Sequence, residues 1–118
     1  MPVTIYGIKN CDTMKKARTW LDEHDIPYRF HDYKTEGIDR ARLETWSAKA
    51  GWEIVLNRAS TTFRALPEDE RTGLNREKAI GLMMAQPSMI KRPVLETDDK
   101  LSMGFKADDY ASLFANGR

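Results

Sequence analysis

The alternation of strand-like, helical and strand-like sequence in the first third of the chain most constrains its fold. Residues 3–8 are β-branched and aromatic, which is typical of a buried strand, and residues 28–33 alternate like a second strand. Between them, a helix is expected from Thr13 to Pro27. Its inner face is expected to contain Ala17, Trp20, Leu21 and His24. Strand, helix and strand in so short a stretch predict a βαβ unit, whose two strands are parallel and joined by a right-handed crossover.

The middle of the chain is predicted to be helical. Asp39 can cap a helix that ends at Gly51, and a shorter helix is expected over residues 60–66. A further helix is expected over residues 75–86, where Pro87 ends it. We therefore expect helices inserted in the centre of the fold.

The last part of the chain predicts a hairpin and one more helix. Residues 93–97 and 100–105 are expected to form antiparallel strands joined by a tight turn at Asp98-Asp99. The inner face of the last helix is expected to contain Tyr110, Leu113 and Phe114. The order βαβ, helices, ββα predicts an α/β protein with a thioredoxin-like fold and a central helical insertion over residues 35–90. We expect residues 1–118 to form a single domain.

Composition and charge are those of an ordinary globular protein. The 118 residues are 41% hydrophobic and 31% charged, with a formal net charge of +1, which gives no reason to expect a nucleic-acid partner. No apolar stretch is long enough for a membrane helix, and we expect no export signal at the start. With one cysteine, the chain cannot form an internal disulfide. We therefore expect a cytoplasmic protein with no membrane partner.

That one cysteine, Cys11, lies between the first strand and the first helix. A helix N-terminus offers free backbone N–H groups and a partial positive charge, both of which favour a thiolate. Lys9 and Lys15 add positive charge nearby, whereas Asp12 opposes it, and either Asn10 or Asp12 is expected to cap the helix. Free cysteines are often simply small buried hydrophobes. The polar neighbours of Cys11 argue instead for a reactive thiol.

Four sequence motifs in order resemble one protein family. They are YGIKNCDTMKKA at residues 6–17, LNRASTT at 56–62, IKRPV at 90–94 and GFK at 104–106. Together they resemble the YffB-like branch of the ArsC/Spx family, and the resemblance extends over nearly the whole chain. It implies a thioredoxin-like (ArsC-like) fold with one nucleophilic cysteine that faces an anion pocket.

The resemblance also implies roles for particular residues. Cys11 would be the nucleophile, and Arg58 and Arg92 would hold negative charge beside it. Lys106 falls near the place of a third family arginine, and a lysine there cannot form the same bidentate contact. Pro93 becomes a candidate cis-proline opposite the thiol. The remaining substrate-binding candidates around the cysteine are Lys9, Asn10 and Thr13.

Two departures from the family patterns limit the function. Arsenate reductases of the family have a histidine where this chain has Gly7, and glycine and serine where it has Asp12 and Met14. Spx regulators have a CxxC switch, and Met14 stands in the place of its second cysteine. No cysteine or carboxylate stands at metal-ligand spacing from either histidine, so we expect no metal site and no bound cofactor.

These observations predict a glutathione-dependent thiol reductase, an arsenate reductase-like enzyme whose single cysteine relies on an external thiol. Glutathione would be the co-substrate, with a small oxidised or oxyanionic molecule as substrate and glutaredoxin as a further candidate partner. Two alternatives stay open: a true arsenate reductase dependent on glutathione or glutaredoxin, and a non-catalytic interaction protein related to the Spx regulators.

Overall fold

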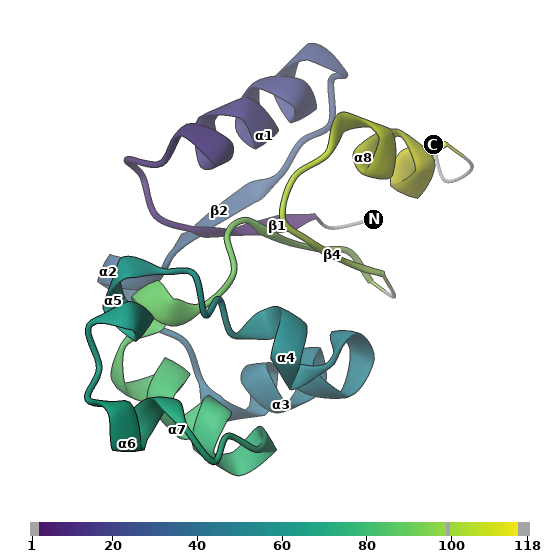
Figure 1. Cartoon of the computed structure of the whole chain (residues 1–118). Helices are drawn as coiled ribbons and strands as arrows, with labels where there is room; N and C mark the ends of the chain where they lie inside the picture. The colour runs from purple at the N-terminus through teal and green to yellow at the C-terminus, as the bar shows by residue number, and fades with distance from the viewer. Residues whose placement is uncertain (1–2, 99, 116–118) are drawn as a thin grey trace. The chain divides into compact units, whose positions relative to one another are not determined.

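The computed structural model describes residues 3–98 and 100–115. The chain divides into two compact units, shown in Figure 1. The sheet unit consists of Met1–Asp32 and Arg92–Arg118, and the helical unit of Tyr33–Lys91. Among the described residues, no helix combines the length and the apolar character needed to cross a membrane. The mixed α/β architecture is that predicted from the sequence.

The sheet unit contains a four-stranded sheet of described residues in the order β2-β1-β3-β4. Its strands are β1 (Thr4–Gly7), β2 (Arg29–Asp32), β3 (Val94–Glu96) and β4 (Leu101–Met103). β1 pairs parallel to β2 and antiparallel to β3, and β3 pairs antiparallel to β4. The βαβ unit and the hairpin are therefore confirmed. The predicted turn at Asp98-Asp99 includes Asp99, which lies outside the described residues.

Two helices pack on this sheet, α1 (Asp12–Glu23) and α8 (Ala107–Phe114) (Figure 1). The shared core contains Val3, Ile5, Met14, Ala17, Leu21, Ile26, Leu95, Tyr110 and Phe114. Met14 belongs to this buried face although the predicted stripe began at Ala17. His24 does not belong to it: α1 ends at Glu23, so His24 is the C-cap and its side chain is exposed.

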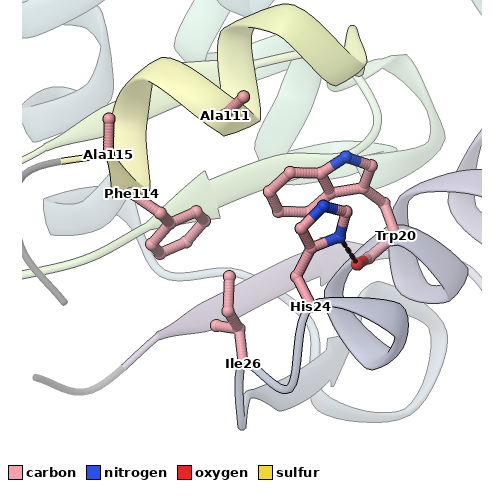
Figure 2. Close-up of a pocket in the computed structure, with 6 residues that line it drawn as sticks. All are labelled: Trp20, His24, Ile26, Ala111, Phe114 and Ala115. Carbon is pink, nitrogen blue, oxygen red and sulfur yellow. Dashed lines mark hydrogen bonds between the residues drawn. The ribbon is translucent and has the colours of Figure 1, made fainter.

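A small cavity opens between the C-terminal ends of these two helices (Figure 2). Its volume is about 200 Å³, and it is lined by Trp20, His24, Ile26, Ala111, Phe114 and Ala115. The His24 imidazole stacks on the Trp20 indole with 3.8 Å between ring centroids. Its Nδ1 lies 2.8 Å from the Trp20 carbonyl oxygen, a hydrogen bond that fixes the ring over the last turn of α1.

The helical unit is built from short helices. They are α2 (Tyr33–Glu36), α3 (Arg40–Ala50), α4 (Trp52–Val55), α5 (Thr61–Arg64), α6 (Glu68–Arg71), α7 (Arg76–Ala85) and the 3₁₀ helix η1 (Pro87–Met89). Tyr33, predicted to end the second strand, begins α2 instead. Three polar side chains cap helices: Asp39 accepts from the Arg42 N–H, Ser60 from Phe63 and Asn75 from Lys78.

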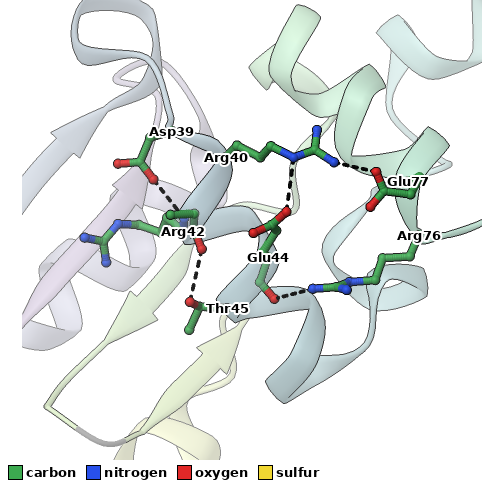
Figure 3. Close-up of polar contacts among 8 residues, drawn as sticks. Asp39, Arg40, Arg42, Glu44, Thr45, Arg76 and Glu77 are labelled. Atoms are coloured by element: carbon green, nitrogen blue, oxygen red, sulfur yellow. Dashed lines mark hydrogen bonds and ion pairs between the residues drawn. The ribbon is translucent and has the colours of Figure 1, made fainter.

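Polar contacts join α3 to α7 at their exposed surface (Figure 3). Arg40 binds Glu44 on its own helix at 3.1 Å and Glu77 on α7 at 2.6 Å. Arg76 donates to the Glu44 carbonyl oxygen at 3.3 Å. The buried apolar side chains of this unit include Leu43, Trp46, Ala79, Ile80 and Met83. The helical segment is therefore a packed unit with its own core.

Candidate functional site

The candidate site begins where β1 passes into α1. Cys11 is the N-cap of α1, with extended backbone angles of φ −141° and ψ 128°. Its carbonyl oxygen accepts a hydrogen bond from the Lys15 N–H at 3.0 Å, which closes the first helical turn. The expectation that Asn10 or Asp12 caps this helix is therefore wrong, because Asp12 is already its first helical residue. The cysteine itself occupies the position usually taken by serine, threonine, asparagine or aspartate.

The surroundings of Cys11 favour its thiolate. Partial burial raises the pKa of the thiol. The opposing effects are larger in sum: hydrogen bonding from the Met14 N–H, the Arg92 side chain and the Thr13 N–H, and the positive charge of Arg92, all of which lower the pKa. The net effect lowers the Cys11 pKa below its ordinary value. The Cys11 side chain makes no formed capping hydrogen bond in the structure, so these donors lie near the sulfur without closing a bond to it. The thiolate, a much stronger acceptor, is the form that these donors stabilise.

The backbone donors belong to the second and third residues of the helix, whose N–H groups have no partner within a helix. The residue type of Met14 does not indicate that its amide lowers the Cys11 pKa. This effect is expected once Cys11 is known to be the N-cap, because an N-cap side chain accepts a hydrogen bond from the N2 or N3 amide. The causes of the lowered pKa do not include Lys9 or Lys15, the lysines predicted to help. Among the described residues, one arginine and a helix terminus supply the effect.

The side chain of Met14 fixes this first turn against the sheet. Met14 is completely buried, and its side chain covers the Cα of Gly7 at the end of β1. An ideal Cβ added to Gly7 would lie 2.3 Å from the Met14 Sδ and 2.8 Å from its Cε. Any side chain at residue 7 would therefore have to displace Met14. Gly7 and Met14 both depart from the arsenate reductase pattern, and the structure shows that they are in contact, so the small residue makes room for the large one.

Arg92 is the first residue of the second segment of the sheet unit. It immediately precedes Pro93, and the peptide bond between them is cis. Pro93 is buried, and its carbonyl oxygen accepts a hydrogen bond from the Gly104 N–H at 2.8 Å, next to the β3–β4 pair. The sheet therefore brings Cys11 and Arg92 together although they lie far apart in the sequence.

The other predicted residues lie as follows. Asn10 and Lys9 are exposed just before Cys11, and Thr13 is partly buried in the first turn. Lys106 is exposed at the N-cap of α8. Of these, the structure connects only Thr13 with the thiol, through its N–H. The binding roles of the other three stay predictions.

Arg58 lies in the helical unit, where it is exposed in a turn between α4 and α5. The turn is held by Asn57, whose Oδ1 accepts from the Ala59 N–H at 3.1 Å and whose carbonyl oxygen accepts from the Ser60 N–H at 3.1 Å. The turn therefore places Arg58 at the exposed surface of the helical unit. Its predicted role beside Cys11 stays a prediction.

A partly exposed thiol with a lowered pKa, beside a guanidinium, can act as a nucleophile toward an electrophilic sulfur or an oxyanion. The guanidinium can hold a carboxylate or another anion of the attacked molecule. Within residues 3–98 and 100–115, no group of three or more histidine, cysteine, aspartate or glutamate side chains is placed to hold a metal ion. The chemistry that these residues support is that of a single thiol.

Comparison with known proteins identifies chains of similar sequence and fold. The solved structure of a YffB protein is 62% identical and has a TM-score of 0.91, covering 93% of this chain and 96% of that one. An arsenate reductase (ArsC) related protein from Brucella melitensis is 60% identical, with a TM-score of 0.77 and coverage of 97% and 95%. An uncharacterized protein from Haemophilus influenzae is 40% identical over 96% of this chain and 99% of its own length.

More distant relatives include the global transcriptional regulator Spx of Listeria innocua, 28% identical over 91% of this chain and 82% of its own. The pattern of the ArsC family matches residues 6–113, from the end of β1 to the last turn of α8. That span contains Cys11, the helical unit and the cis peptide bond before Pro93. The thioredoxin-like arrangement is that of similar solved structures, and the chain belongs to the ArsC family.

Proposed function

We propose that this protein is a thiol reductase that uses Cys11 as its only redox-active group and glutathione as the external thiol. The observation that carries the proposal is the Cys11 thiol itself, placed at the N-cap of α1 with the Arg92 side chain beside it and with a lowered pKa. Membership of the ArsC family and 60% identity to an arsenate reductase (ArsC) related protein support thiol-based reductase chemistry.

The first step is thiol–disulfide exchange. The Cys11 thiolate attacks the glutathione sulfur of a mixed disulfide between an oxidised substrate and glutathione, a new S–S bond forms between Cys11 and glutathione, and the substrate leaves as a thiolate. The sequence has one cysteine, so no second thiol of this chain can displace the bound glutathione. A second external thiolate must attack the mixed disulfide, which releases Cys11 as a thiolate and leaves the new disulfide in solution. Glutaredoxin is a candidate source of that second thiol.

The arginines give the reaction its selectivity for an anionic partner. Glutathione carries carboxylates, and a guanidinium binds a carboxylate through two parallel hydrogen bonds. Arg92 lies at the thiol, and we propose that Arg58 provides a second contact from the helical unit. Lys106, with Lys9, Asn10 and Thr13, would complete the binding surface, and Pro93 would limit it opposite the thiol.

The test is the rate at which the protein gains one glutathione, measured by intact mass after mixing with glutathione disulfide. We expect the wild type to react faster than a free cysteine peptide and Cys11→Ser not to react. Arg92→Ala and Arg58→Ala should each slow the reaction about tenfold to a hundredfold, because hydrogen bonds to charged groups contribute roughly 1.5–3 kcal/mol. Arg92→Lys should recover only part of that loss.

Arg71 offers a matched control, because it is an exposed arginine whose Nε donates to the Leu66 carbonyl oxygen within the helical unit. Arg71→Ala should react like the wild type. The proposal fails if the wild type reacts no faster than the peptide. It fails also if both arginine variants at the site match Arg71→Ala.

Arsenate reduction is the first alternative. An acidic residue beside the thiol, Asp12, disfavours an oxyanion, and a lysine in place of a third arginine weakens its bidentate binding. We therefore expect little Cys11-dependent arsenite production from arsenate with glutathione present. A robust signal in a coupled assay would favour the alternative over our proposal.

A regulatory role without catalysis is the second alternative, and the similarity to Spx regulators supports it. Methionine at residue 14 excludes a CxxC switch but leaves protein binding open. An ordinary thiol pKa, together with no gain of glutathione, would favour this role. A lowered pKa with rapid adduct formation would favour the enzyme.

A further inference from the structure

The cavity between α1 and α8 is a second feature of the sheet unit, separate from the thiol. The helix α1 has 12 residues and therefore a length of about 18 Å, with Cys11 at one end and the cavity at the other. Its volume of about 200 Å³ is smaller than the roughly 300–1,000 Å³ of pockets that enclose small-molecule ligands. A cavity of this size suits one side chain of a larger partner.

The walls of the cavity are aromatic and partly exposed. Figure 2 shows Phe114 and Ile26 facing the stacked Trp20 and His24 rings. Trp20 and Phe114 are nearly parallel, with an interplanar angle of 25° and 6.1 Å between their centroids. Phe114 and Ile26 are buried, whereas Ala111 and Ala115 are exposed at the rim. The cavity therefore has aromatic rings in its lining, and the faces of aromatic rings attract cations.

The surroundings of the cavity are acidic. A second, more open hollow of about 410 Å³ is lined by Asp22, Asp25, Ile26 and Pro27, so Ile26 belongs to both hollows. Residues 20–27, at the end of α1, contain three carboxylates, Asp22, Glu23 and Asp25, and no lysine or arginine. With a net charge of only +1 for the whole chain, this is a local excess of negative charge.

The carboxylates near the end of α1 are also unfavourably placed for the helix. The C-terminus of a helix carries partial negative charge, and no basic side chain lies in the last turn of α1. Arg18, one turn earlier, is engaged elsewhere: its Nε donates to the Tyr28 hydroxyl at 3.2 Å, and its guanidinium lies 4.8 Å from the centroid of the Phe30 ring. A cation supplied by a partner would relieve this excess of negative charge.

We propose that this cavity binds an arginine side chain that a partner protein presents on an exposed segment. The planar guanidinium would stack against the aromatic walls, with Asp22 and Asp25 outside to attract its charge. Arginine suits the site better than lysine because its flat, weakly hydrated head stacks on rings. This surface goes beyond the proposed reductase activity and uses none of its residues.

The test uses the whole protein and capped tripeptides acetyl-Gly-Xaa-Gly-amide, in which Xaa is arginine, lysine, leucine or glutamate. Binding is followed by the NMR signal of the Trp20 indole N–H, assigned through Trp20→Phe. Trp46 and Trp52, in the helical unit, serve as internal references. We expect the arginine peptide to shift the Trp20 signal in the millimolar range, lysine to bind more weakly, and leucine and glutamate to leave the signal unchanged.

Two pairs of variants test the location. Ala111→Leu fills the cavity from an exposed helical position and should abolish binding, whereas Ser112→Leu, exposed on the same helix outside the lining, should leave it unchanged. Asp22→Asn with Asp25→Asn should weaken binding roughly threefold to tenfold, because exposed ion pairs contribute modestly. Asparagine also tolerates the positive φ of 56° at residue 25.

Charge removal from α6, by Glu68→Gln with Asp69→Asn, is the matched control and should have no effect. The proposal is overturned if leucine binds as well as arginine, or if Ala111→Leu still binds. It is overturned also if the Trp20 signal shifts with protein concentration alone and Ala111→Leu removes that shift, because the occupant is then a second copy of this chain.

Discussion

Adding one methyl group at Gly7 should destabilise the protein through Met14. An ideal Cβ there would lie 2.3 Å from the Sδ, 2.8 Å from the Cε and 3.2 Å from the Cγ of Met14. Favourable contacts between such atoms require about 3.5–4.0 Å, so the completely buried methionine would have to move. Gly7 does not have a positive φ angle, so its backbone conformation is open to alanine. Packing against Met14 is therefore what makes alanine unfavourable there.

The expected magnitude follows from two opposing effects. Overpacking a core lowers stability by about 1–3 kcal/mol. Replacing glycine by alanine at a compatible position raises stability by about 0.4–1 kcal/mol, because it reduces the conformational entropy of the unfolded chain. Gly7→Ala should therefore lower the free energy of unfolding by up to about 2.5 kcal/mol. Met14→Ala should lower it by about 2–5 kcal/mol, because it leaves a cavity.

The double variant separates this explanation from others. With Met14 reduced to alanine, the new methyl group at residue 7 enters vacated space, so Gly7→Ala should become neutral or stabilising by up to about 1 kcal/mol. Urea unfolding of the wild type, both single variants and the double variant measures the coupling. Gly81→Ala is the control: a Cβ there meets no atom within 4 Å, and alanine should stabilise α7 by about 0.5–1 kcal/mol.

The reasoning is refuted if Gly7→Ala costs the same free energy with and without the Met14 side chain. It is refuted also if Gly7→Ala stabilises the wild type, because the Met14 side chain would then not fill the space beside the Gly7 Cα.

Three further predictions concern the thiol, a helix cap and an ion pair. The iodoacetamide alkylation rate of Cys11 should show an inflection below about 8.5, and Arg92→Ala should move it upward. Since the folded-state pKa is the lower one, the free energy of unfolding relative to Cys11→Ser should grow as pH rises toward about 9 and be lost as pH falls through the folded-state pKa. Asn75→Ala removes the acceptor of the Lys78 N–H and should cost about 1 kcal/mol in urea unfolding. Arg40→Ala breaks exposed ion pairs and should cost less than about 1 kcal/mol, falling further at high salt.

Much of the fold could be predicted because strong local signals coincide with tertiary structure. The caps at Asp39 and Asn75 mark helix starts through side-chain chemistry that needs no partner elsewhere in the chain. The single-turn helices α4 and α6 begin without a capping side chain and gave no such signal, whereas α5, of the same length, begins after the Ser60 cap. Tyr33 continued the alternation of the second strand, so its change to helix was not apparent.

The site was only partly predictable from the residues. The position of Cys11 after a strand and before a helix indicates an activated thiol. Which residue caps the helix depends on backbone angles that sequence does not show. The proximity of Arg92 depends on how β3 is placed beside β1 and could be expected only from the family resemblance. His24 was assigned to a buried face because the helix was expected to continue past Glu23.

The position of Cys11 at a helix cap makes the first helix responsive to the chemical state of sulfur. The Thr13 and Met14 amides stabilise a thiolate at this position, and a neutral thiol is a weaker acceptor for them. The mixed disulfide of the proposed reductase reaction would remove that anion. If the proposal holds, we expect the first turn of α1 to be less restrained in the mixed disulfide than in the thiolate form. Hydrogen exchange at these two amides should consequently report the oxidation state of the protein, without any label on the sulfur.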